Sequence, residues 1–161
     1  MNRLFFMNRL FFLAVILALE LAPVTGASAD TGDKVAVTGD TFTVEEKTHQ
    51  ATFSGNVVVT EARLKLTADQ VIASYGDGGA SNIKSFVATG HVKIVTKDQT
   101  ATGEKAVFDP KTKILTLTGN VLVVSAAGQM KGPELTLDLK KSTSVFSGGK
   151  SGRVTGVFTS Q

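Results

Sequence analysis

The stretch Ala51-Thr-Phe-Ser-Gly-Asn-Val-Val-Val59 alternates apolar and polar residues on either side of a Gly-Asn pair. Successive side chains of a β-strand point to opposite faces, so this alternation predicts a strand with one apolar face. The pattern returns in Phe86-Val-Ala-Thr-Gly-His-Val-Lys-Ile94, Leu115-Thr-Leu-Thr-Gly-Asn-Val-Leu-Val123 and Leu135-Thr-Leu-Asp-Leu139. These segments are rich in Val, Thr, Ile and Phe, which favour strands, and no helical period appears after residue 29. The sequence therefore predicts an all-β fold.

Two markers repeat along the chain and divide it into similar units. Gly55, Gly90, Gly119 and Gly148 lie 35, 29 and 29 residues apart, and the first three precede Asn or His. A small residue followed by an acid recurs at Gly39-Asp40, Ala68-Asp69 and Gly103-Glu104, with a degenerate copy at Gly132 and Glu134. The longer interval contains the loop-forming insertion Tyr75-Gly-Asp-Gly-Gly-Ala-Ser-Asn82. Internal repeats of this kind are typical of rolls and solenoids.

The repeats predict a roll or a stacked solenoid with room for roughly a dozen or more short strands, on typical strand lengths of ~5–6 residues. Polar turns are expected at Glu45, Asp109 and Asp138, each followed two residues later by lysine (Lys47, Lys111 and Lys140). A glycine at a fixed place in each strand fits a bend or bulge. A roll that stays open has an unpaired strand edge at each end, which another chain can extend.

The first 29 residues have the order of segments found in a secretory signal peptide. A short basic start with Arg3 and Arg9 precedes an apolar run at 10–19, and small residues end in Ala27-Ser-Ala29. We predict cleavage after Ala29, export, and one domain over residues 30–161. The alternative is an uncleaved membrane anchor, although the apolar run is about half the length of a spanning helix.

Composition excludes several classes of function. The chain has no cysteine, and removing Arg3, Arg9 and Glu20 from 17 bases and 14 acids leaves 15 and 13, too weak a charge to indicate nucleic-acid binding. Of the two histidines, His49 lies in a polar turn and His91 takes the place of Asn56 and Asn120 in the sister repeats. No catalytic or phosphate-binding motif occurs. We therefore expect no enzyme activity, no catalytic residues, no metal site and no cofactor.

The ordered series of motifs resembles a known family. Residues 51–60 with Leu64-Lys-Leu-Thr-Ala-Asp-Gln-Val71 are similar to the OstA-like motif of lipopolysaccharide-transport proteins, and the pattern returns at 101–104, 115–121 and 130–134. Gly152-Arg-Val-Thr-Gly-Val157 resembles the end of the family's periplasmic bridge component. The likeness covers nearly all of residues 35–159.

The resemblance implies an OstA-like β-jellyroll, open at both ends, with an apolar groove between its two sheets. It implies a periplasmic protein that carries lipopolysaccharide from the inner to the outer membrane and holds the acyl chains of lipid A in that groove. It also implies head-to-tail self-association and contact with a membrane-anchored subunit at one end and the outer-membrane assembly protein at the other.

The apolar residues of each strand are the candidate lipid-binding residues, and each also suits an ordinary core position. They are Val35, Val37, Phe53, Val57, Val59, Leu64, Leu66, Phe86, Val92, Ile94, Leu115, Leu117, Val121, Val123, Leu135 and Leu137.

Two sets of charged residues have alternative interpretations. The repeated acids Asp40, Asp69 and Glu104 are about 30 residues apart without a calcium-loop cluster, which favours structural turn or edge positions over a metal site. Lys84, Lys93 and Lys97 are close in sequence and suit either lipid phosphates or, with more weight, solvated strand edges that discourage aggregation.

Two other functions stay open beside the carrier. One is a docking component of the same transport system, such as a soluble relative of the membrane-anchored subunit or a detached amino-terminal domain. The other is a lipid-free β-repeat structural protein.

Overall fold

The chain divides into two compact units, residues 1–31 and 32–161, and the computed structural model describes residues 35–149 and 152–159, all within the second. The predicted signal peptide and its cleavage site lie outside the described residues. No helix among the described residues is long and apolar enough to span a membrane.

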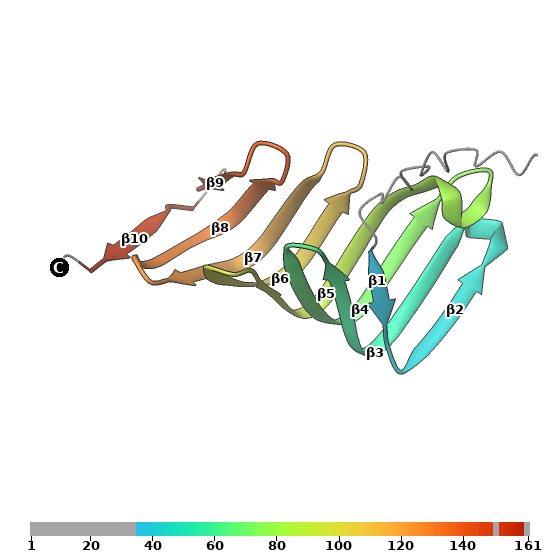
Figure 1. The fold of residues 1–161 in the computed structure, drawn as a ribbon. Helices are drawn as coiled ribbons and strands as arrows, with labels where there is room; N and C mark the ends of the chain where they lie inside the picture. The colour runs from blue at the N-terminus through green and yellow to red at the C-terminus, as the bar shows by residue number, and fades with distance from the viewer. Residues whose placement is uncertain (1–34, 150–151, 160–161) are drawn as a thin grey trace, which may run out of the picture. The chain divides into compact units, whose positions relative to one another are not determined.

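The described residues form strands joined by tight turns and two short 3-10 helices, which confirms the all-β prediction (Figure 1). In chain order they are β1 (Ala36–Thr38), β2 (Thr41–Glu45), η1 (Glu46–Thr48), β3 (Gln50–Glu61), β4 (Leu64–Tyr75), η2 (Gly79–Asn82), β5 (Ile83–Val95), β6 (Gln99–Asp109), β7 (Ile114–Ser125), β8 (Gly128–Asp138), β9 (Thr143–Ser147) and β10 (Thr155–Phe158).

All ten described strands belong to one antiparallel sheet in the order β1-β3-β4-β5-β6-β7-β8-β10. β2 also pairs with β3, and β9 also pairs with β8. The central strands β3 to β8 are 11–13 residues long, so the expectation of short strands throughout is wrong. Gly55, Gly90 and Gly119 bend their strands without ending them, because backbone pairing with the next strand continues on both sides of the bend.

A row of β-bulges crosses the sheet at the repeated glycines. Two residues on β3, β5 and β7 (Gly55-Asn56, Gly90-His91 and Gly119-Asn120) oppose one residue on the next strand (Asp69, Glu104 and Pro133). Both residues of each pair have positive φ, between 46° and 83°. Bulges bend strands, so the predicted glycine bend is confirmed.

The bulge row divides the sheet into two halves. One half, here called the upper half, contains β2, β9 and the turns at 46–49, 76–82, 110–113 and 139–142, of which the last two lie at the top of Figure 1. The lower half contains β1, β10 and the turns at 62–63, 96–98 and 126–127. Leu64 and Leu66 of the lower half line the same cavity as Leu115 and Leu139 of the upper half, so the inner faces of the two halves lie opposite each other.

The repeated acids hold the bend together. Nδ2 of Asn56 donates to Oδ2 of Asp40 at 2.8 Å, and Nδ2 of Asn120 donates to Oε1 of Glu104 at 2.6 Å. Nδ1 of His91 lies 2.8 Å from Oδ2 of Asp69. These contacts explain why marker and glycine keep a fixed spacing. Asp40 lies in the turn between β1 and β2 as expected, but the turn or edge expectation is wrong for Asp69 and Glu104, which lie within the central strands β4 and β6.

The last copy of the bend is different. Pro133 on β8 stands where β4 and β6 carry Asp69 and Glu104, opposite Gly119 and Asn120. Proline offers neither a carboxylate nor a backbone N–H. The degenerate marker at Gly132 therefore corresponds to a bend without the acid contact.

Candidate functional site

The apolar interior between the two halves is the main candidate site. Its core consists of buried Val, Leu, Ile and Ala side chains from β3 to β8, and the structure finds no buried polar side chain among the described residues. Lipid hydrocarbon and apolar side chains avoid water for the same reason, so this surface is chemically suited to acyl chains.

All sixteen candidate residues lie on this interior. Eleven are buried core residues: Val57, Leu64, Leu66, Val92, Ile94, Leu115, Leu117, Val121, Val123, Leu135 and Leu137. Val37, Phe53, Val59 and Phe86 are partly buried against them, and Val35 lines a cavity. Their contact with lipid stays a prediction.

Sequence reasoning missed several interior residues because the alternation changes phase at the acid strands. On β4, Leu66 and Ala68 are buried before Asp69, and Val71 and Ala73 are buried after it, an odd step of three residues. A strict period of two therefore passes over residues such as Val71, Ala106 and Phe108. The acid marker could have identified this shift, since Asp69 on β4 and Glu104 on β6 are the single residues that oppose the bulges of the neighbouring strands.

Most of the interior is filled rather than hollow. One cavity of about 40 Å³ lies between the halves, and a second of about 160 Å³ lies near β9 and β10, where Met130, Phe146 and Phe158 line it. A water molecule needs ~10–15 Å³ on this measure, so the first cavity has room for only a few waters. Where a groove was expected, the structure has a packed core with one cavity lined by residues of β3 to β7 and another near β9 and β10.

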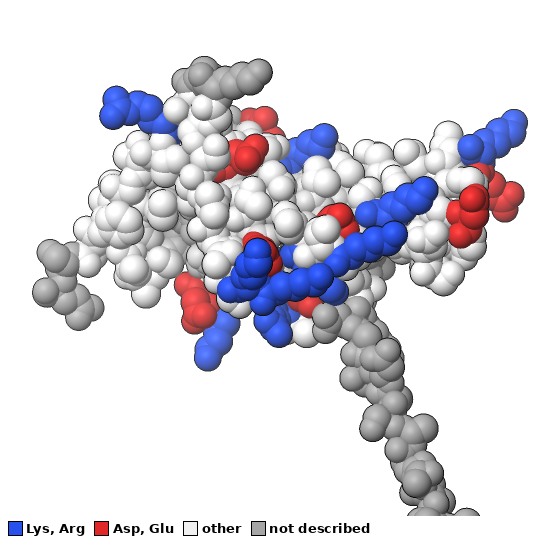
Figure 2. Space-filling view, turned by 90° about the horizontal axis from the view of Figure 1, so that it is seen from above, with Lys and Arg blue, Asp and Glu red and all other residues white. Residues whose placement is uncertain are grey.

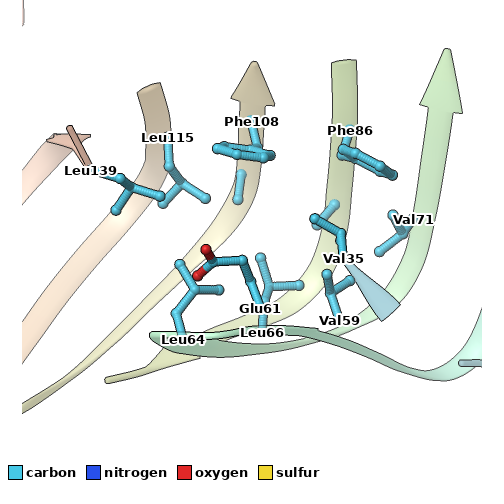
Figure 3. Close-up of a pocket in the computed structure, with 12 residues that line it drawn as sticks. Val35, Val59, Glu61, Leu64, Leu66, Val71, Phe86, Phe108, Leu115 and Leu139 are labelled. Atoms are coloured by element: carbon cyan, nitrogen blue, oxygen red, sulfur yellow. The ribbon is translucent and has the colours of Figure 1, made fainter. Parts of the chain in front are cut away.

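The first cavity has both an apolar wall and a charged margin (Figure 3). Phe86 and Phe108 line its upper side, with ring centroids 6.4 Å apart in a stacked arrangement. Glu61, at the end of β3, is the one charged residue among the twelve described residues that line it. Its Oε2 accepts the backbone N–H of Arg63 at 3.0 Å, which fixes the carboxylate beside the β3–β4 turn.

The turns above this cavity are ordered by aspartates, as the sequence predicts. Oδ1 of Asp109 accepts the backbone N–H groups of Lys111 and Thr112, and Oδ1 of Asp138 accepts those of Lys140 and Lys141. The hydrogen bond from Thr112 is the main cause that lowers the pKa of Asp109. The hydrogen bond from Lys141 does the same for the pKa of Asp138.

The three lysines considered for phosphate contacts do not form one cluster. Lys84 lies near the start of β5 in the upper half, Lys93 is exposed on the lower half, and Lys97 follows the far end of the same strand. The bend at Gly90 and His91 lies between Lys84 and the other two lysines, so the three are divided between the two halves of the sheet. Closeness in sequence was misleading because β5 is one long strand.

Both ends of the sheet expose strand edges with apolar side chains. Phe42 and Val44 on β2 are 58% and 49% exposed, and Val157 and Phe158 on β10 are 57% and 69% exposed. Among the described strands, β1 and β2 pair only with β3, and β9 and β10 pair only with β8. The predicted open ends are confirmed.

Comparisons with known proteins agree on one family. The family model described as "LptA/(LptD N-terminal domain) LPS transport protein" matches residues 36–143. The chain is 26% identical over 153 residues to the lipopolysaccharide export system protein LptA of Escherichia coli K12 and, equally, to that of Shigella flexneri, covering 90% of this chain and 81% of each relative.

The crystal structure of LptH from Pseudomonas aeruginosa has a similar fold. LptH is described as the LptA-homologous periplasmic component of the conserved lipopolysaccharide transport device. The match has a TM-score of 0.66 at 18% identity, and it covers 79% of this chain and 96% of LptH.

Proposed function

Because this chain belongs to the LptA/(LptD N-terminal domain) family of LPS transport proteins, we propose that it is a periplasmic lipopolysaccharide carrier. In this role the protein binds the acyl chains of lipopolysaccharide between the two halves of its sheet and passes the lipid from the inner to the outer membrane. The role requires shielding of hydrocarbon and no catalytic residue.

The observation that carries the proposal is the shared apolar interior of the bent sheet. Each CH₂ group removed from water gains ~0.8 kcal/mol, so a binding interior needs only apolar side chains and access. The cavities are too small for a full acyl chain, and binding therefore requires the halves to separate. Such a separation is possible because the two halves are joined at the bulge row, and the described core contacts between them are made by side chains.

The two exposed edges support end-to-end assembly. β2 and β9 each have five residues in the upper half, and β1 and β10 have three and four in the lower half. The β9–β10 edge of one copy can therefore extend the β1–β2 edge of the next and continue both halves. The same edges suit the membrane-anchored subunit at one end and the outer-membrane assembly protein at the other.

Photo-crosslinking tests where the lipid binds. A photoreactive phenylalanine analogue at Phe108, which lines the first cavity, is expected to crosslink to added lipopolysaccharide in the purified mature protein. The same analogue at Val107, the preceding residue of β6 on the other face, is the matched control. Protein–lipid adducts are measured on denaturing gels by an antibody against lipopolysaccharide.

A strong adduct at Phe108 with little at Val107 supports the interior as the lipid site. Equal adducts at both positions indicate nonspecific surface binding. If saturable adducts are absent at both positions, the carrier function is contradicted and the lipid-free structural protein is the remaining candidate.

Removing the last strand tests the assembly proposal. Deleting residues 153–159 is expected to weaken self-association while most β-structure remains, because β10 pairs only with β8 among the described strands. Val157→Lys should have a similar effect, since an edge lysine opposes strand addition. Light scattering measures oligomer size, and circular dichroism measures strand content.

Val124→Lys is the matched control for the edge substitution. Val124 is 47% exposed but lies on β7, which is paired on both sides. Oligomers that are unchanged by the deletion, or reduced equally by Val124→Lys, would count against edge pairing.

A docking component is the second candidate, because the description of the family model also includes the amino-terminal domain of LptD. The chain covers 81% of LptA and 96% of LptH, which favours the carrier.

A further inference from the structure

We propose that the basic turns around the first cavity form a seat for the phosphate groups of the bound lipid, with Arg63, Lys111 and Lys140 as its main contacts. This phosphate seat rests on the proposed carrier function and adds a determinant of specificity to it. It assigns the head group a place on the protein, beside the cavity that takes the hydrocarbon.

The three bases lie next to residues that line the cavity. Arg63 immediately precedes Leu64, Lys140 immediately follows Leu139, and Lys111 lies in the turn between Phe108 and Leu115. The lining residues come from the lower half on one side and the upper half on the other (Figure 3). The three bases are therefore sequence neighbours of cavity-lining residues from both halves.

Hydrogen bonds hold the two upper turns together. Nζ of Lys140 donates to the backbone oxygen of Lys111 at 3.0 Å, and the backbone N–H of Leu139 donates to the oxygen of Lys113 at 3.0 Å. An ammonium group has three donors, so Lys140 keeps two for a ligand. These hydrogen bonds hold the Lys140 ammonium beside the turn that carries Lys111.

The charges at this margin favour an anion. Lys141 forms a salt bridge with Asp138 at 3.5 Å, but none of Arg63, Lys111 and Lys140 forms one with the described residues. All three are exposed. Figure 2 shows Lys and Arg side chains gathered in a row across the middle of the face seen from above, the side toward which the upper turns project in Figure 1.

The acids at the margin are already engaged with the protein. Asp109 and Asp138 accept backbone N–H groups within their own turns, and Glu61 accepts the N–H of Arg63. Apart from the electrostatic attraction between Lys111 and Asp109, these carboxylates contact backbone N–H groups rather than the three basic side chains. A neutral head group would gain little here, since charge-assisted hydrogen bonds are the stronger class.

The test compares two probes with the same acyl chains and different charge, bisphosphoryl and monophosphoryl lipid A. Wild-type mature protein is expected to bind the bisphosphoryl probe about tenfold more tightly at low salt, since its additional phosphate forms further charge pairs with the bases. The triple variant Arg63→Gln/Lys111→Gln/Lys140→Gln should lose most of this preference. Affinities are measured by fluorescence titration, and folding by thermal melts.

The matched control removes three exposed lysines elsewhere, Lys93→Gln/Lys105→Gln/Lys131→Gln, with the same change in net charge. It should keep the preference within about twofold, because the distance to the cavity margin and screening weaken its effect. Inorganic phosphate at millimolar concentration should compete no better than an equal ionic strength of chloride salt.

The outcomes separate the phosphate seat from the carrier function. Equal wild-type affinity for the two probes, equal loss of preference in the control variant, or tight competition by inorganic phosphate would overturn the seat and leave the carrier standing. Binding of neither probe would overturn both. Selective loss in the triple variant supports the seat.

Discussion

Gly119→Ala is expected to destabilise the folded protein by about 2–4 kcal/mol. Gly119 has a φ of +83°, and a non-glycine residue in this region costs roughly 1–2 kcal/mol. An added Cβ would also lie 2.7 Å from Cβ of Glu104, an atom fixed by its backbone. Urea denaturation followed by circular dichroism measures the change in the free energy of unfolding.

Gly79→Ala separates backbone strain from collision. Gly79 has a φ of +67°, but an added Cβ would have no neighbour within 4 Å. Its loss should therefore be confined to strain, about 1 kcal/mol. If the two variants were equally stable, the close contact between the acid and the glycine would not be a support of the bend.

The bend is the part of the fold that the sequence predicts best. The regular spacing of Gly-Asn or Gly-His after an acid reflects a contact between neighbouring strands, as the pair of Asn120 and Glu104 shows. Such a contact fixes both residue type and interval, so it leaves a visible repeat. The strand lengths were mispredicted because a typical length of ~5–6 residues was applied to strands that continue through the glycine bend.

The interior was predicted in part, for a physical reason that differs by strand. On β7 the alternation keeps its phase across Gly119 and Asn120, so Leu117 and Val121 are both identified. On β4 and β6 a single acid opposes the bulge, which leaves an odd step between inward side chains, and Val71 and Ala106 are missed. The small alanines also give a weak hydrophobic signal, although they allow the two halves to approach closely.

The filling of the interior could not be predicted from the pattern. Alternation predicts which side chains point inward, but the distance between the two halves depends on how their side chains interlock.

The basic residues proposed as the phosphate seat were not grouped from the sequence for a similar reason. Arg63 and Lys111 are 48 positions apart in sequence, and only the bend brings their turns to the two sides of one cavity.

Leu117→Ala tests whether the packed interior supports the fold as well as the proposed lipid site. Leu117 is 0% exposed in the centre of the core, and truncating a buried leucine costs about 2–5 kcal/mol. Leu122→Ala on the same strand is the matched control, because Leu122 is only partly buried and pairs with the exposed Lys131. We expect its loss of unfolding free energy to be less than half that of Leu117→Ala, by urea denaturation. Equal losses would mean that the two faces of β7 are packed alike. Such a result would contradict the assignment of the inner face as the apolar site for acyl chains.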